Sequence, residues 1–460
     1  MNQPSASAAY REARARVAAE PDNGTALFNL GWTASRVGEF EAAIVAYQRA
    51  LALSITEPEE AMHNLAVVYS EQLGDLEKAH VWLDRALTAN KAYFPAVFHR
   101  AHLLEQVGDR AAALAGFRQA ALLRPDDALA LARCVEAADP ERGIEASVLE
   151  RLQAFAEGGD PDALFALAKY DEQQGRFESA WARFEAANAA DAEGRPEWPA
   201  RALFERVLRE PEQYLPAPGD AGGPVFIVGM FRTGSTLLEQ ILAAHPRFSP
   251  LGESEFWPRQ IVRMGGRMVI PGQQPRTQDL PDLRRSFDAM VASRRLAPAT
   301  RPTDKRPDNL FHIASLARVL PEARFVITDR DWRDTLISVF GTRLHAQHGY
   351  ATSVLAIREQ LRLCKALADR WEAVWPERIT QLRYEDLISR PEATLQRLLG
   401  WLGESWDPAC LDFHRLDNPV RTASVWQVRQ PLHATRQGRW RCYEAQLRER
   451  FGSGLDDEWP

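Results

Sequence analysis

The sequence has few of the features that mark secreted, membrane-spanning or metal-binding proteins. Only four cysteines occur in 460 residues, and Cys134, Cys364, Cys410 and Cys442 form neither a CxxC pair nor a metal-ligand spacing. We interpret them as reduced, structural thiols. Residues 1–20 contain no apolar core of signal-peptide length, and no stretch approaches about 18 consecutive apolar residues, so no membrane span is predicted. The expected location is the cytoplasm.

An excess of positive charge is also missing. The formal net charge is −7, whereas a general nucleic-acid-binding protein is usually basic, so no nucleic-acid partner is predicted. Hydrophobic residues make up 45% and charged residues 26% of the chain, as in ordinary globular proteins. A chain of 460 residues is too long for one ordinary domain, and we expect two or three.

A glycine-centred pattern occurs four times in the first half of the chain. In each copy the glycine is followed by alanine at +5, a large side chain at +9 and alanine at +12. The copies are Gly38, Ala43, Tyr47, Ala50; Gly74, Ala79, Leu83, Ala86; Gly108, Ala113, Phe117, Ala120; and Gly175, Ala180, Phe184, Ala187. The glycines are 36, 34 and 67 residues apart, so a degenerate repeat is expected around residues 125–155.

This pattern is typical of a helix–turn–helix unit. The glycine ends the first helix in a left-handed conformation, the alanines permit close helix packing, and the large residue fills the groove between helices. A period near 34 residues resembles the tetratricopeptide repeat (TPR), which stacks into an all-α solenoid. We assign residues 1–200 to this domain. Its concave face is expected either to hold a peptide, protein or partner subunit, or to serve only as a scaffold.

Prolines and glycines then interrupt the chain. A short helix is expected at residues 200–208, and the breaking residues that follow predict a linker over residues 201–223 with a domain boundary near residue 215. The prolines and glycines in question are Pro211, Pro216, Pro218, Gly219, Gly222 and Gly223. Residues 224–460 form the second predicted domain.

The second domain opens with the pattern of a phosphate-binding loop. The apolar run Pro224–Val228 is followed by Gly-Met-Phe-Arg-Thr-Gly-Ser-Thr and then by an amphipathic helical pattern. In such a layout, backbone N–H groups and the helix N-terminus face an anion. The spacing fits GxxxxGK[ST], except that Ser235 replaces the lysine that neutralises nucleotide phosphates in ATPases and kinases. The replacement favours a phosphosulfate, which carries less charge, over ATP; an ordinary strand–turn–helix is the alternative.

The segments FIVGMFRTGSTLLEQIL and HPRFSPLGESEFWP, taken with the repeats, resemble TPR-containing sulfotransferases, and they are also similar to tyrosylprotein sulfotransferases. The resemblance covers nearly the whole chain. It implies a P-loop α/β domain with a parallel sheet flanked by helices, 3′-phosphoadenosine-5′-phosphosulfate (PAPS) as co-substrate, PAP as product, and no metal. The implied cofactor-binding residues of the loop are Arg232, Thr233, Gly234, Ser235 and Thr236.

A second anion-binding motif follows a predicted strand at residues 323–328. Arg330 lies just past this strand, and Ser338 lies eight residues further on, inside a predicted helix. Because ligands bind at the carboxyl ends of strands in open α/β sheets, this pair can hold a second phosphate. The pair resembles the 3′-phosphate motif of the family, which usually has proline where this chain has Trp332. A simple salt bridge of Arg330 is the alternative.

The resemblance also implies catalytic groups. Lys305 stands in the Asp-Lys-x-Pro context of the family's catalytic lysine, and with Arg232 it is expected to stabilise the transferring and leaving oxygens. Glu253 follows a glycine at the position of the proposed general base of tyrosylprotein sulfotransferases, and Glu255 is an alternative base. Cytosolic sulfotransferases use a histidine base, for which the candidates here are His312, His345 and His348. We interpret these histidines as structural.

The C-terminal part is locally rich in arginine, which suggests either an anionic ligand or a solvated helical face. The resemblance implies a further set of cofactor-binding residues here, namely Tyr384, Ser424, Arg429, Arg439 and Trp440. The chain has Gln430 where a related group of enzymes has lysine. It therefore stays open whether Arg429 or Arg439 contacts the cofactor.

The expected activity is transfer of a sulfuryl group from PAPS to an acceptor hydroxyl. A tyrosine of a peptide or protein held by the TPR groove, a glycan hydroxyl and a small-molecule hydroxyl are alternative acceptors. Two other classes are a P-loop kinase, against which the missing lysine counts, and a non-catalytic TPR adaptor, against which the joint presence of the motif residues counts. The sequence does not predict the oligomeric state.

Overall fold

The structure is a computed structural model that describes residues 6–139, 143–196, 198, 200–208, 222–263, 275–294, 296–297, 300–422, 424–433 and 437–457. The chain divides into two compact units. The first unit holds Met1–Glu105 and Asp109–Asp139, and the second holds Gln106–Gly108 and Pro140–Pro460. Most of the predicted linker, residues 209–221, lies outside the described residues.

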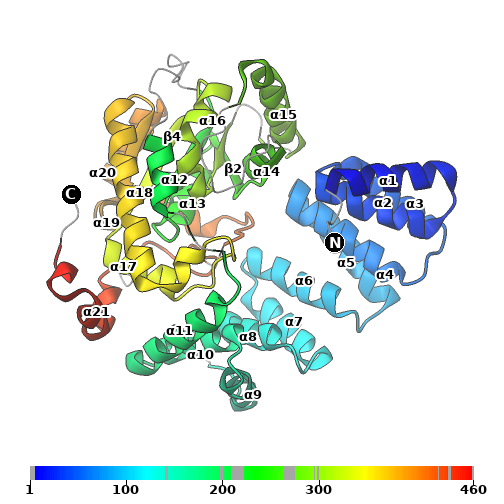
Figure 1. Ribbon diagram of the computed structural model, residues 1–460, viewed down its shortest axis with the longest axis horizontal. Helices are drawn as coiled ribbons and strands as arrows, with labels where there is room; N and C mark the ends of the chain where they lie inside the picture. The colour runs from blue at the N-terminus through cyan, green and yellow to red at the C-terminus, as the bar shows by residue number, and fades with distance from the viewer. Residues whose placement is uncertain are drawn as a thin grey trace. The chain divides into compact units, whose positions relative to one another are not determined.

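The first unit consists of helices (Figure 1, blue to cyan). They are α1 (Ala6–Ala19), α2 (Gly24–Val37), α3 (Phe40–Ala52), α4 (Pro58–Val67) with a π-helical continuation (Val68–Leu73), α5 (Leu76–Ala89), α6 (Phe94–Gln106), α7 (Arg110–Leu123) and α8 (Ala128–Ala137). Aspartates begin several helices by accepting a backbone N–H, as Asp75 does at α5 and Asp109 at α7. The sequence thus sets both ends of these helices.

The four repeat glycines have the predicted left-handed conformation. The φ angles of Gly38, Gly74, Gly108 and Gly175 are 86°, 72°, 86° and 73°. All eight repeat alanines and all four large residues at +9 are buried. The helical repeat pattern is therefore confirmed in its local geometry, since each turn lies where the glycine permits it and each alanine lies in a helix contact.

The second unit begins with four more helices and continues into a sheet domain. The helices are α9 (Ala146–Glu157), α10 (Pro161–Gln173), α11 (Phe177–Ala192) and α12 (Ala200–Leu208). Helices α8 and α9 occupy the stretch where a degenerate repeat was expected. Within the described ranges, no helix is both long and apolar enough to span a bilayer.

A five-stranded parallel sheet forms the centre of the second unit. Its strands are β1 (Val225–Gly229), β2 (Phe248–Gly252), β3 (Arg301–Asp304), β4 (Arg324–Asp329) and β5 (Ile379–Arg383), in the order β2-β3-β1-β4-β5. All four neighbouring pairs are parallel, and Gly229 pairs with Thr328 in the register. The expected parallel α/β sheet is confirmed.

Helices cover this sheet (Figure 1). They are α13 (Ser235–Ala243), α14 (Phe256–Arg263), α15 (Leu280–Ser293), α16 (Ile313–Val319), α17 (Trp332–Phe340), α18 (Val354–Val374), α19 (Tyr384–Ser389) and α20 (Pro391–Leu402), and α21 (Glu444–Phe451) follows near the C-terminus, apart from the sheet. Apolar residues of β1, β4 and β5 share one buried core with α13 and α20. Because β1 is buried along its whole length and residues 325–328 of β4 are buried as well, the sheet is covered on both faces at these two central strands.

The last helical hairpin, α10–α11, belongs to the sheet domain rather than to the first unit. The Trp181 ring lies 5.2 Å from the ring of Phe340 and 5.8 Å from that of Tyr443, centroid to centroid. The Asn188 side chain donates to the Phe340 carbonyl at 2.8 Å. The expected domain of residues 1–200 therefore does not coincide with the compact units, because the contacts of its last repeat lie on the sheet domain.

We predict that Trp181→Ala lowers the free energy of unfolding of the second unit by about 3–5 kcal/mol, because a buried indole leaves a cavity when it is removed. Chemical denaturation measures the loss. The control is Leu355→Ala, since Leu355 is 60% exposed on α18 and its truncation should cost less than about 0.5 kcal/mol. Equal effects of the two substitutions would contradict the packing described.

Candidate active site

Each of the five strands carries a predicted site residue to the same edge of the sheet. Glu253, Lys305, Arg330 and Tyr384 directly follow β2, β3, β4 and β5, and Arg232 lies in the loop after β1. The carboxyl ends of parallel strands lie along one edge, which is where ligands bind in such sheets. Residues that are up to 152 positions apart in the sequence therefore lie together.

The loop after β1 has an unusual backbone. Gly234 has a φ of 97°, and Arg232 is one of few non-glycine residues with a positive φ, 71°. A Cβ atom on Gly234 would lie 2.7 Å from Cδ2 of Tyr384, so this glycine is required both by its conformation and by the close approach of a ring. Helix α13 begins at the next residue, Ser235. Its first N–H groups therefore face the edge of the sheet.

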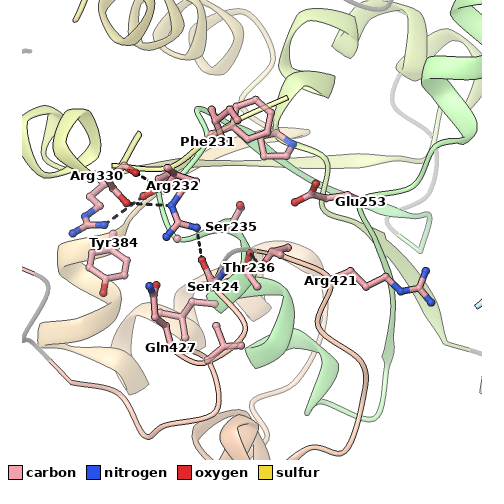
Figure 2. A pocket seen from close by; sticks show the side chains of 18 of the residues that line it. Phe231, Arg232, Ser235, Thr236, Glu253, Arg330, Tyr384, Arg421, Ser424 and Gln427 are labelled. Carbon is pink, nitrogen blue, oxygen red and sulfur yellow. Dashed lines mark hydrogen bonds between the residues drawn. The ribbon is translucent and has the colours of Figure 1, made fainter. Parts of the chain in front are cut away.

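A pocket of about 600 Å³ lies at this edge (Figure 2). Ten of the predicted residues line it: Arg232, Gly234, Ser235, Thr236, Glu253, Arg330, Ser338, Tyr384, Ser424 and Arg439. They come from loops after four of the strands, from α17 and from the C-terminal segment. The tertiary structure thus brings together most of the residues that the sequence motifs single out.

Arg232 links three of these elements. Its Nε donates to Ser338 Oγ at 3.1 Å and its Nη1 donates to Ser424 Oγ at 2.7 Å. The Arg232 carbonyl accepts from Arg330 Nη1 at 3.4 Å, and the Arg330 guanidinium lies 4.7 Å from the centre of the Tyr384 ring. Figure 2 shows Arg330 and Tyr384 on the side of the pocket away from Glu253, with Arg232 and Ser424 beside them. Two arginines and two serine hydroxyls therefore converge at one end of the pocket.

Glu253 and Lys305 form an ion pair at the other end. Lys305 Nζ lies 2.6 Å from Glu253 Oε1. The lysine side chain is only 1% exposed, whereas the glutamate is 37% exposed and lines the pocket. An acid or base at Glu253 is therefore accessible to a ligand, and the ammonium lies directly behind it.

Three predicted cofactor-binding residues lie outside the lining of this pocket. Thr233 Oγ1 donates to the Met230 carbonyl at 2.7 Å, and Arg429 donates to the carbonyls of Leu416 and Asn418. The backbone N–H of Trp440 donates to Asp334 at 2.9 Å. In the structure these three residues hold loops in place, and their prediction as ligand contacts gains no support from their positions.

Arg439 lines the pocket, and its guanidinium pairs with Glu172 of α10. Its Nη2 donates to Glu172 Oε2 at 2.6 Å. Of the two cations that the sequence left as alternatives, Arg439 is therefore the one placed at the pocket. A carboxylate of the last repeat hairpin holds it there.

The alternative bases occupy different surroundings. Glu255 also lines the pocket, but its Oε1 accepts from Arg306 Nη1 at 2.6 Å. His345 and His348 line the pocket as well, and burial lowers the pKa of His348 to about 3. An imidazole with so low a pKa is a weak proton acceptor near neutral pH. His312 is buried and is not among the lining residues.

Within the part of the chain that the structure describes, no group of three or more histidine, cysteine, aspartate or glutamate side chains could hold a metal ion. His345 and His348 lie between α17 and the next helical turn, outside any helix, and no third candidate ligand joins them in those residues.

Comparison with known proteins bears on this site. Residues 224–408 match the profile of the sulfotransferase family, and residues 24–54 and 59–93 match that of the tetratricopeptide repeat. Residues 224–408 are a sulfotransferase-family domain. The sulfotransferase domain thus includes every described strand of the sheet and the first two predicted anion-binding motifs, and the chain in front of it carries TPR repeats.

Individual relatives are distant. An uncharacterized protein of Aquifex aeolicus (strain VF5) is 28% identical over 238 residues, which cover 49% of this chain and 31% of that protein. Protein-tyrosine sulfotransferase 1 of Danio rerio is 26% identical over 219 residues, which cover 44% of this chain and 59% of that protein. The match thus spans less than two thirds of either relative. Among solved structures, the sulfotransferase domain from the Synechococcus PCC 7002 olefin synthase superimposes with a TM-score of 0.39 at 18% identity, covering 54% of this chain and 98% of that domain.

The sequence motifs did not single out Glu239, which is fully buried on α13 of the sulfotransferase domain. Its Oε1 accepts from the Gly252 N–H at 3.1 Å and from Thr303 Oγ1 at 3.3 Å. Burial raises the pKa of this carboxyl to about 7, against the opposing effect of nearby Lys305. The signal in the sequence was an acidic residue within a largely apolar helix after the predicted phosphate loop.

We predict that Gly234→Ala destabilises the sulfotransferase domain by about 1–3 kcal/mol, because a Cβ atom is strained at this positive φ and collides with Tyr384. Thermal unfolding measures the shift. Gly400→Ala is the matched control, since Gly400 lies inside α20 with no atom within 4 Å of an added Cβ. This control should stabilise the protein by about 0.5–1 kcal/mol, and a loss at Gly400 with none at Gly234 would contradict the loop geometry.

Proposed function

We propose that this protein transfers a sulfuryl group from PAPS to an acceptor hydroxyl, and that the acceptor is a tyrosine of a peptide or protein. The observation that carries the proposal is one pocket that holds two kinds of group. Arginines and hydroxyls suited to anion binding line one end, and Glu253 lines the other, ion-paired with Lys305, which is buried and not among the lining residues. A phosphate loop without the nucleotide-binding lysine connects them.

The donor end fits a ligand with separate phosphate and phosphosulfate groups. Arg232, Arg330 and Arg439 supply positive charge, and Ser338 and Ser424 supply hydroxyl groups. The N-terminus of α13 adds backbone N–H donors beside them. A volume of about 600 Å³ is typical of pockets that hold a ligand of this kind. We propose that Arg330 and Ser338 contact the 3′-phosphate and that the α13 end contacts the 5′-phosphosulfate.

The transfer end supplies acid–base and electrostatic groups. When bound, PAPS supplies the sulfuryl group as an activated mixed anhydride. In the proposed reaction Glu253, which lines the pocket, takes the proton of the acceptor hydroxyl, and the hydroxyl oxygen forms a bond to sulfur as the bond from sulfur to the phosphate oxygen breaks. Lys305 donates one hydrogen bond to Glu253, and an ammonium has three donors, so it can also stabilise the charge that develops on the leaving oxygen.

Two observations support a tyrosine acceptor. The TPR repeats of the first unit are of a kind that binds extended partners on a concave face. The sulfotransferase domain is 26% identical to a protein named protein-tyrosine sulfotransferase. The first unit would then recruit the peptide, and the pocket would modify it.

The donor assignment predicts that the protein binds PAP tightly in the presence of a metal chelator and binds ATP poorly. Arg330→Ala should weaken PAP binding by about 1.5–3 kcal/mol, because a charge-assisted contact is lost, and should change binding of adenosine 5′-phosphosulfate little. Isothermal calorimetry with the three ligands tests both statements. Tight ATP binding without a response to PAP would overturn the sulfotransferase assignment. If Arg330→Ala weakened the binding of PAP and of adenosine 5′-phosphosulfate equally, Arg330 would not contact the 3′-phosphate.

The transfer assignment predicts that labelled sulfate passes from PAPS to tyrosine in fractionated cell extract. Glu253→Gln should reduce the rate by at least about 100-fold while PAP affinity stays unchanged, because only the base is lost. Glu255→Gln is the control, since it removes the neighbouring carboxylate that pairs with Arg306. Label in a sugar or small molecule would exclude the tyrosine acceptor, and a large loss for Glu255→Gln alone would move the base to Glu255.

A further inference from the structure

A buried carboxylate joins the helix of the phosphate loop to the two strands that carry the proposed catalytic pair. Oε1 of Glu239, on α13, accepts from the backbone N–H of Gly252 and from the hydroxyl of Thr303. Gly252 ends β2 immediately before Glu253, and Thr303 lies in β3 two residues before Lys305. A single oxygen atom therefore contacts both strand ends.

Both backbone polar groups of Gly252 are hydrogen-bonded. Its N–H donates to Glu239, and its carbonyl accepts from the Lys305 N–H at 2.9 Å. The register of β2 and β3 shifts between Pro250 and Gly252, and Gly252 has a φ of 69°. Without Glu239, the N–H of this irregular strand end would lack its acceptor from α13. The path of the chain into Glu253 therefore depends on a side chain of α13.

We propose that Glu239 is a positioning residue that sets the placement of Glu253 relative to Lys305 by fixing the ends of β2 and β3 to α13. The catalytic role of Glu253 and Lys305 rests on the proposed function. The claim that Glu239 fixes where these two side chains lie does not depend on it. Glu239 lies in the second turn of α13, the helix whose N-terminus faces the donor end of the pocket. The same helix would then align the donor site with the acid–base pair.

The chemistry of the position argues against a packing role alone. Glu239 lies among the apolar residues Leu238, Ile241 and Leu242, which supply the core contacts of α13. A buried carboxyl costs desolvation energy that an apolar side chain at this position would avoid. Its two hydrogen bonds to the strand ends offset part of that cost and are directional. An apolar residue would supply packing but no such direction.

The charges around Glu239 come from two elements. Lys305 and Asp304 lie at the end of β3, and Glu253 follows β2. Lys305 and Glu253 act electrostatically on the Glu239 carboxyl, and Glu239 in turn acts on the Asp304 carboxyl. The pKa of Glu239 is raised by burial to about 7, and that of Asp304 is also raised by burial. As the pH rises through 7, Glu239 gains a negative charge beside the Lys305–Glu253 pair. An ionised carboxylate is a stronger acceptor than a protonated one, so the hydrogen bonds that fix Gly252 and Thr303 should strengthen, and the rate of transfer should rise with pH through this range.

Two variants at this position test the inference. Glu239→Leu removes both hydrogen bonds and should lower turnover by about 100-fold, the cost of a small misplacement of catalytic groups, with PAP affinity unchanged. Glu239→Gln keeps an acceptor oxygen and removes the charge. It should restore most of the turnover at pH 6 and lose the rise in rate through pH 7. Since packing is similar in both variants, a purely structural role would not produce this difference.

The matched control is Glu404→Gln. Glu404 is a partly buried carboxylate that binds Arg301 at the opposite end of β3. The Glu404→Gln substitution should leave the pH profile of turnover unchanged. In addition, Glu239→Leu combined with Glu253→Gln should lose less than the two single losses added together, because part of the effect of Glu239 passes through Glu253. Additive losses in the double variant would overturn the proposal.

A crystal structure of Glu239→Leu separates this proposal from the proposed function. We expect the 2.6 Å contact between Lys305 Nζ and Glu253 Oε1 to be lost in Glu239→Leu and kept in Glu239→Gln. If Gly252, Glu253 and Lys305 do not move in Glu239→Leu, the proposal is wrong whatever reaction the protein performs. If they move but the wild-type protein neither binds PAP nor transfers sulfate, the positioning role stands and the proposed function fails.

Discussion

The left-handed turn at Arg232 and Gly234 is the constraint on which the site depends. It leads directly into α13 at the edge of the sheet and lets Tyr384 approach the backbone within contact distance. The same turn directs the Arg232 guanidinium to Ser338 and Ser424, which come from segments far along the chain. One strained loop thus organises the donor end of the pocket, because it holds both the helix end and the arginine that contacts these hydroxyls.

The opposite end of the pocket is organised by buried charge. Lys305 is almost fully enclosed, and Glu239 and Asp304 are fully enclosed beside it. Burying three ionisable groups is unfavourable for stability unless they are paired and hydrogen-bonded. Such groups are retained where position matters more than stability, and perturbed carboxyl pKa values are common at functional sites. The two ends of the pocket therefore use different means, a backbone turn at one and a carboxyl–ammonium cluster at the other.

The last repeat hairpin serves the sheet domain directly. Glu172 of α10 pairs with Arg439 at the pocket, and Trp181 of α11 packs against Phe340 of α17. Helix α17 carries Ser338, so the hairpin supports two lining residues from outside the sheet. The repeat array is therefore continuous in sequence but divided in structure. Its final hairpin follows the helix–turn–helix pattern of the others, and that pattern does not say which surface the hairpin will contact.

Local and periodic features could be predicted from the sequence alone, because they depend on neighbouring residues. The repeat glycines adopt the left-handed turns that the pattern predicts. The predicted site residues that follow the strands lie at the edge formed by the strands' carboxyl ends, as a parallel sheet requires. Only the tertiary structure decided which long side chains reach the pocket. Arg429 turns to backbone carbonyls and Arg439 to the pocket, although both stand in one basic segment. Glu239 became a site residue for the same reason: its partners, Gly252 and Thr303, are fixed by strand order and not by sequence spacing.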